Sequence, residues 1–100
     1  MSLRRRRFDH LAVELSVALG EVVPRYALWL CLGELGLDPD HLRREDAVSF
    51  VDEHLDPFLR SQGLSLRGRE RRGLRRRIAA YDPRFLTPYE RMERLARASR

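Results

Sequence analysis

The chain has 100 residues, of which 43% are hydrophobic and 35% are charged, and its formal net charge is +5. This length is typical of one domain with one hydrophobic core, and the apolar fraction is too high for a chain that is disordered throughout. The single cysteine, Cys31, excludes an intramolecular disulfide framework, and the longest apolar run, residues 26–32, is far below the ~20 residues needed to cross a bilayer. We therefore expect a cytoplasmic protein without a membrane span.

Basic and acidic residues are segregated along the chain. All 20 basic residues are arginine; residues 57–100 hold 13 of them against four carboxylates, whereas residues 8–56 hold three against eleven. The remaining four form a run at positions 4–7, and we interpret residues 1–7 as a flexible basic tail before a single domain at 8–98. This distribution indicates that the C-terminal half contacts an anionic surface, either on another molecule or on its own acidic half.

Apolar residues recur three and four positions apart, and no segment alternates with the period of a strand, so the fold class is all-α. The first helix is predicted at 8–22, although Gly20 weakens its end. The second is predicted at 24–35, with Pro24 at its start and Gly36 as its C-terminal cap. Because this second segment is apolar on every side, we expect it to be the central helix, or to have one side covered by another protomer.

The third helix is predicted at 44–62, with a break or kink at Pro57 and an end near Gly63. Val51 and Leu55 belong to its apolar stripe, and its opposite side is acidic. Phe50 lies between the two faces, where it is either a peripheral core contact or an exposed apolar side chain available to a partner.

The fourth helix is predicted at 67–81, with a narrow apolar stripe and a broad arginine face. The fifth is predicted at 88–98, where Thr87 and Glu90 have the spacing of a capping box. We expect this last helix to bury Tyr89, Met92, Leu95 and Ala96. The three Asp-Pro pairs should each start a helix or a single turn, because Asp accepts from free backbone donors and Pro supplies a preset dihedral; they are Asp38-Pro39, Asp56-Pro57 and Asp82-Pro83.

Taken together, these segments predict a compact bundle of about five short helices. No two of the three histidines and Cys31 have the spacing that brings metal ligands onto one helical face, and no glycine-rich phosphate loop is present. We therefore expect no catalytic residue, metal or cofactor. The side chains expected near the centre of the bundle are Trp29, Leu32, Val51, Leu55, Leu74 and Ile78.

The strongest functional signal is the arginine face of the fourth helix. Clustered arginines bind carboxylates and phosphates with bidentate hydrogen bonds, although an acidic helix packed nearby could neutralise them within the fold. We expect a noncatalytic adaptor or assembly subunit that binds an acidic protein surface or a second copy of itself; the alternative is nucleic-acid binding through phosphate contacts. The predicted partner-binding residues are Arg67, Arg69, Arg72, Arg75 and Arg76, with Phe50 and Trp29 as apolar anchors.

Overall fold

The computed structural model describes residues 5–85 and 87–98, and every regular element in that part of the chain is helical. Because α3, η2 and α4 follow one another without a gap, they form one interrupted helix, and the predicted all-α bundle of about five helices is confirmed. None of the helices described is long and apolar enough to span a membrane. In chain order the elements are α1 (Arg6–Leu19), α2 (Arg25–Glu34), the 3-10 helix η1 (Pro39–His41), α3 (Arg44–Ser49), the π-helix η2 (Phe50–His54), α4 (Leu55–Ser61), α5 (Gly68–Ala80) and α6 (Pro88–Ala98).

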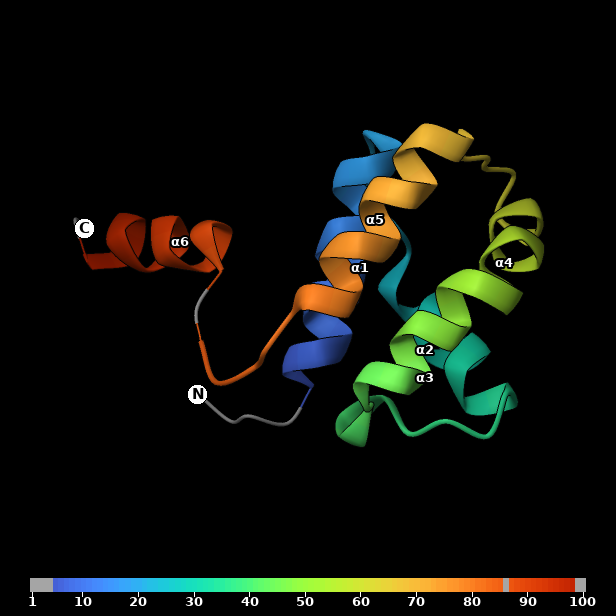
Figure 1. Ribbon diagram of the computed structural model, residues 1–100, viewed down its shortest axis with the longest axis horizontal. Coiled ribbons are helices and arrows are strands. Elements are labelled where there is room, and N and C mark those ends of the chain that lie inside the picture. The colour runs from blue at the N-terminus through green and yellow to red at the C-terminus, as the bar shows by residue number, and fades with distance from the viewer. Residues whose placement is uncertain (1–4, 86, 99–100) are drawn as a thin grey trace.

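The centre of the fold is built by α1 and α5, which lie side by side, with the interrupted helix packed against them (Figure 1). Leu11 and Leu15 of α1 are fully buried, and their spacing of four residues places both on the face toward α5. Most of the predicted central residues are confirmed, since each of the following is at most 1% exposed: Leu32, Val51, Leu55, Leu74 and Ile78.

The bounds of α1 differ from the predicted range 8–22 at both ends. Gly20 adopts a left-handed conformation with φ of 75°, and its N–H donates to the carbonyls of Ser16 and Val17, which ends the helix. Arg6 and Arg7, assigned to a flexible tail from the sequence, are helical residues of α1. Residues 1–4 of that predicted tail lie outside the described residues.

The predicted interruption of the third helix is present, but it takes the form of a π-helical turn that ends at His54, three residues before Pro57. A proline ring clashes with the carbonyl four residues earlier, and the wider π turn displaces that carbonyl. In a π turn, residues five apart rather than four return to the same side, so Phe50 and Leu55 both face the core. Phe50 is 0% exposed and packs edge-to-face on Phe58 with ring centroids 6.0 Å apart, so neither expectation for Phe50 is correct.

The prediction that the second helix is central is wrong. Only Leu28 and Leu32 of α2 are fully buried, whereas Tyr26 is 74% and Leu30 is 46% exposed. A short bundle whose centre is filled by α1, α5 and the interrupted helix leaves α2 in an outer layer, with one side uncovered. Trp29 is consequently half-buried at the edge of the core rather than near its centre.

α6 stands apart from the other helices, at one end of the long axis of the molecule (Figure 1). Its bounds match the predicted range 88–98, but its expected burial is wrong, because Met92 is 70% and Leu95 is 68% exposed and Ala96 is also exposed. The side chain of Tyr89 lies outside the part that is described. The physical reason is the connector: a turn at Asp82-Pro83 and a new helix start at Thr87 direct α6 away from the core, so within the described residues Met92 and Leu95 stay largely exposed.

Candidate protein-docking surface

The arginines of α5 do not form one uniform face. The N-terminal end of the helix is capped by Glu70, whose carboxylate accepts from the backbone N–H of Arg67. Three arginines farther along α5 turn toward carboxylates of the acidic half of the chain. These ion pairs are Arg71 with Asp56, Arg75 with Asp52 at 2.7 Å, and Arg77 with Glu14 at 2.6 Å.

The pair between Arg75 and Asp52 is the clearest neutralisation at this site. Both guanidinium nitrogens of the fork, Nε and Nη2, donate to the two carboxylate oxygens, at 2.7 and 3.1 Å. The hydrogen bonds raise the pKa of Arg75 and lower the pKa of Asp52. Arg75 was predicted to contact a partner, but in this structure its donors are used within the fold.

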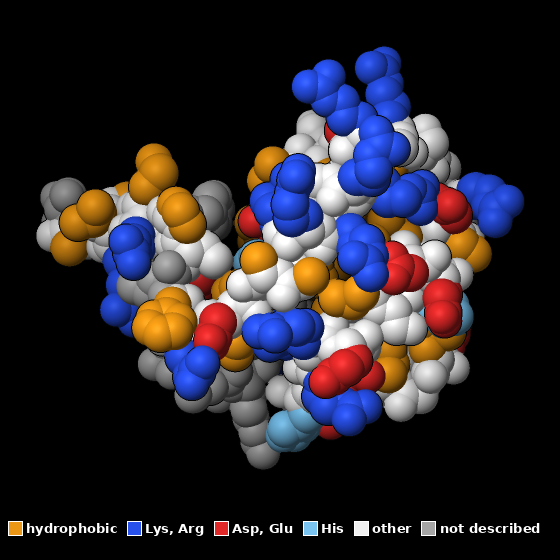
Figure 2. Space-filling view, in the orientation of Figure 1, with side chains coloured by type: hydrophobic (Ala, Val, Ile, Leu, Met, Phe, Trp, Pro, Cys, Tyr) orange, Lys and Arg blue, Asp and Glu red, His pale blue; other side chains and the backbone are white. Residues whose placement is uncertain are grey.

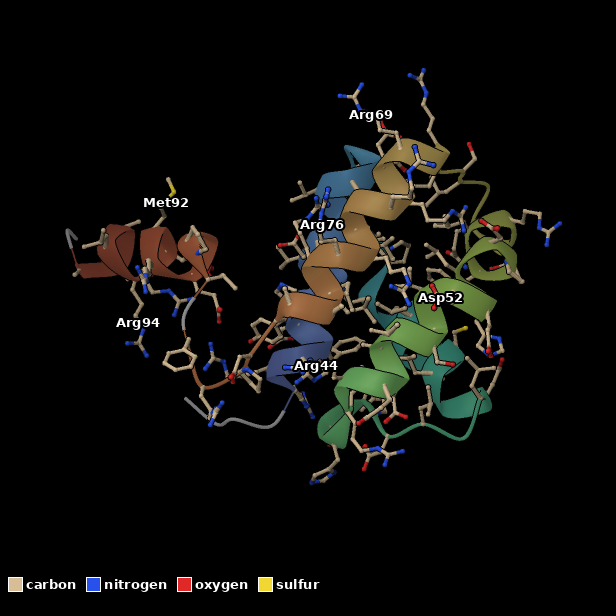
Figure 3. The ribbon with its side chains drawn as sticks, viewed as in Figure 1. Arg44, Asp52, Arg69, Arg76, Met92 and Arg94 are labelled. Atoms are coloured by element: carbon tan, nitrogen blue, oxygen red, sulfur yellow. The ribbon has the colours of Figure 1, made fainter. Side chains whose placement is uncertain are left out.

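Four other arginines, three in α5 and one at its N-cap, remain available, and we call them the α5 arginine patch. All four are exposed, and within the described residues none of them forms an ion pair. Figure 2 shows cationic side chains gathered over α5, and Figure 3 shows Arg69 and Arg76 pointing away from Asp52 into solvent. The patch consists of Arg67, Arg69, Arg72 and Arg76.

The two apolar anchors predicted from the sequence do not join this patch. Phe50 is fully buried and cannot touch a partner without local unfolding. Trp29 is half-buried; its ring packs edge-to-face on Phe8 with centroids 5.3 Å apart and is covered by the Arg5 guanidinium 4.9 Å from the ring. Trp29 therefore presents little free apolar surface.

The apolar surface that sequence reasoning missed is on α6. Met92, Leu95 and Ala96 lie on one side of this helix and are all exposed, and we call them the α6 stripe. Hydrophobic side chains follow the upper edge of α6 in Figure 2, and Met92 projects upward from α6 in Figure 3. The sequence held a signal for this arrangement, since two turn-forming pairs, Asp82-Pro83 and Thr87-Pro88, separate the stripe from every other apolar segment.

The start of α6 is linked to α1 by one arginine side chain and is closed by its own capping box. The predicted capping box is confirmed: the N–H of Glu90 donates to the Thr87 hydroxyl at 3.1 Å, and the N–H of Thr87 donates to the Glu90 carboxylate at 3.0 Å. Arg6 of α1 donates to the same carboxylate at 2.6 Å and to the Pro83 carbonyl. Partial burial would raise the pKa of Glu90, but the bonds from Thr87 and Arg6 outweigh it and lower that pKa.

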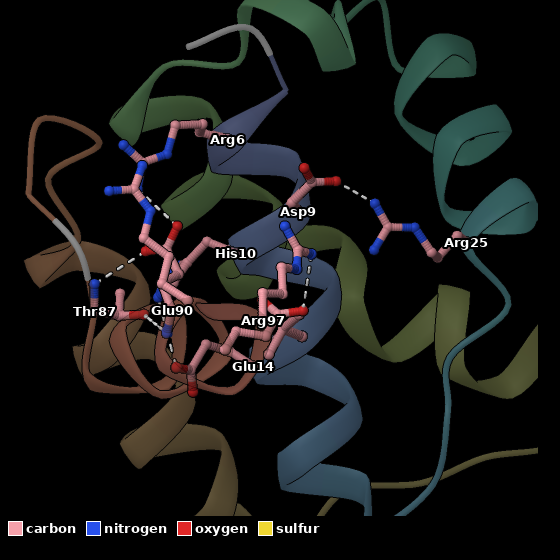
Figure 4. Close-up of a pocket in the computed structure, with 11 residues that line it drawn as sticks. Arg6, Asp9, His10, Glu14, Arg25, Thr87, Glu90 and Arg97 are labelled. Carbon is pink, nitrogen blue, oxygen red and sulfur yellow. Dashed lines mark hydrogen bonds and ion pairs between the residues drawn. The ribbon is translucent and has the colours of Figure 1, made fainter. Parts of the chain in front are cut away.

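A pocket of about 370 Å³ lies between α1 and α6 (Figure 4). Its charged side chains are mostly matched within the pocket wall, since Asp9 pairs with Arg25, and Glu93 lies 3.5 Å from Arg97. His10 lies in the wall and stacks on Tyr81 with ring centroids 3.8 Å apart. Burial lowers the pKa of His10, helped by Arg7 and Arg77 and opposed by Glu14 and Glu90.

Chemistry elsewhere in the described residues is equally sparse. No group of three or more His, Cys, Asp and Glu side chains in the described part of the chain is arranged to hold a metal ion. Cys31 is half-buried, and burial raises the pKa of its thiol, which lowers the fraction of reactive thiolate.

Comparisons with protein-family models, with curated protein sequences and with solved structures found no match. The geometry of the molecule is therefore the only guide to its function. Two surface features of the described residues are exposed to solvent: the α5 arginine patch and the α6 stripe.

Proposed function

We propose that this protein is a noncatalytic adaptor or assembly subunit that binds a protein partner through the α6 stripe and the α5 arginine patch. The observation that carries this proposal is the exposure of Met92 and Leu95, at 70% and 68%, on a helix that stands apart from the core. An isolated helix of 11 residues is only marginally stable in water, since ~12–15 residues are needed even for good helix formers. Covering its apolar side with a partner would stabilise it.

The charges of the α5 arginine patch favour an acidic partner. Arg69, Arg72 and Arg76 keep all their guanidinium donors free within the described residues, so they can form bidentate bonds with carboxylates. Charges of this kind mainly speed association and select the partner, while buried apolar anchors supply most of the affinity. A partner segment with apolar and acidic faces fits both features. The expected cytoplasmic location remains a prediction.

Nucleic-acid binding is the second candidate, and the unpaired arginines of the patch favour it, because phosphates are also bound by guanidinium forks. Arg5 and Arg6 add little to such a surface. Arg5 lies 2.6 Å from Asp40, and the Arg6 side chain is only 10% exposed and paired with Glu90. The exposed apolar side chains of α6 would not contribute to phosphate binding, so we rank this candidate below protein binding.

The test is affinity purification of the tagged full chain from its native cell, at low and high salt, with and without nuclease. We compare the wild type with Arg72→Glu/Arg76→Glu and with a control of equal charge change, Arg44→Glu/Arg60→Glu. Both control positions are exposed and lie on α3 and α4. The proposal requires that the patch variant loses a protein partner that survives nuclease, while the control variant keeps it.

Two outcomes would refute the proposal. Partners that disappear with nuclease would transfer the function to nucleic acid. Unfolding of the patch variant, seen as a lost helical signal in circular dichroism, would show that these arginines stabilise the fold, since exposed positions usually change stability by less than about 0.5 kcal/mol.

A further inference from the structure

We infer that the partner of the α6 stripe is a second copy of this chain, and that the stripe docks into a groove between α2 and α4 of that copy. This inference rests on the proposed function, because it names the partner of the same stripe. It would make the protein an assembly subunit whose copies bind head to tail.

The groove between α2 and α4 is a second uncovered apolar surface. It has a volume of about 380 Å³, and its apolar wall includes Ala27, Leu30 and Leu35 from the α2 side and Pro57 and Phe58 from α4. Leu30 is 46% and Leu35 is 37% exposed, so the groove displays aliphatic side chains that the fold itself leaves uncovered. Its size and composition suit two or three aliphatic side chains from a helix, which is what the α6 stripe presents.

The charges around the two surfaces are complementary. Glu34 lines the groove and forms no ion pair within the described residues. Glu53, next to the lining residue His54, lies 3.7 Å from the Nε2 of that histidine and accepts from the Ser49 hydroxyl. On α6, Arg91 is likewise without an ion pair in the described part of the chain, and at 100° per residue it lies beside Leu95. A docked α6 would therefore place the Arg91 guanidinium beside the Glu34 carboxylate, and neither group forms an ion pair within the described residues.

The same chain cannot fill its own groove with α6. In Figure 1, α6 lies at one end of the molecule, while α2 and α4 lie on the other side of α1 and α5. The ion pair between Arg6 and Glu90, at 2.6 Å, holds the start of α6 on the α1 side. Docking between copies uses two different surfaces, and such a heterologous contact produces open chains or closed rings rather than a symmetric dimer.

The interface would be small, because α6 has 11 residues and is about 16 Å long. Contacts of this size are at the weak end of specific interfaces, so assembly should depend on concentration and on salt. The experiment is analytical ultracentrifugation of the purified full chain over a series reaching about 1 mM. We expect the weight-average mass of the wild type to rise beyond that of a dimer.

Variants on each surface make the test specific. Leu95→Glu disables the stripe, Leu30→Glu disables the groove, and Val22→Glu, at a position 85% exposed and outside both surfaces, is the matched control. Each of the first two variants should remain monomeric alone. Mixed together they should form a one-to-one heterodimer and nothing larger, because each retains the surface that the other lacks. Val22→Glu should assemble like the wild type.

The charge pairing gives a second readout. Glu34→Arg should weaken assembly of the whole chain at low salt, and combining it with Arg91→Glu in the same chain should restore assembly. A wild type that stays monomeric throughout, or a mixture that forms no heterodimer, would overturn the inference. If the chain then still captured a nuclease-resistant protein through Arg72 and Arg76, the proposed function would stand with a different partner.

Discussion

Replacing Phe50 with alanine should severely destabilise this protein. Phe50 is 0% exposed, sits at the start of the π turn and packs on Phe58 with centroids 6.0 Å apart. Removing a fully buried phenylalanine side chain costs about 3–5 kcal/mol, from lost transfer free energy and from the cavity left behind. A domain of this size has a total free energy of unfolding of about 5–15 kcal/mol, so the variant should lose a large fraction of its stability.

The measurement is urea unfolding followed by helical circular dichroism. With a urea dependence of about 1–3 kcal/mol per molar, the midpoint of Phe50→Ala should fall by at least ~1 M. Phe85→Ala is the control, because Phe85 is 64% exposed and its loss should change the midpoint little. If Phe50→Ala does not fold, Phe50→Leu should still show an intermediate loss. A cost for Phe50→Ala below about 1 kcal/mol, equal to that of Phe85→Ala, would refute the burial of this ring and the register of the π turn.

Three further predictions concern the termini of α1 and its contacts with α6. Folding lowers the pKa of His10 below its ordinary 6.5, so the unfolded chain takes up the proton first as pH falls. The free energy of unfolding should therefore decline as pH drops below about 6.5. His10→Phe, which keeps the stack on Tyr81, should remove this part of the pH dependence of the urea midpoint. Thr87→Ala should cost about 1 kcal/mol of local helix stability, seen as faster amide hydrogen exchange in α6, while exchange in α1 stays unchanged. Gly20→Ala should lower the thermal midpoint, because alanine at φ of 75° costs about 1 kcal/mol, and an unchanged midpoint would contradict the left-handed cap.

Much of this fold could be read directly from the residues. Helix starts and ends depend on atoms within about four residues of one another, so local chemistry decides them. The Thr87–Glu90 capping box, the turn at Asp38-Pro39 and the left-handed Gly36 that follows α2 are all found where the sequence predicts them. The periodicity of the core residues also follows locally, because three- and four-residue spacing selects one helical face.

Only the tertiary structure decided which apolar and charged faces meet a neighbour. The pairing of Arg77 with Glu14 joins residues 63 positions apart, and nothing local distinguishes Arg77 from Arg76, which points to solvent. For the same reason α2 and the α6 stripe were expected to be buried. An apolar pattern indicates that one face of a helix is suited to burial, but it does not indicate whether another element packs on that face. The register of Phe50 depended on how a π turn accommodates Pro57 against the packed core, which is a property of the whole bundle. The uncovered stripe and the free arginines, and with them the proposed docking function, are consequences of that three-dimensional arrangement.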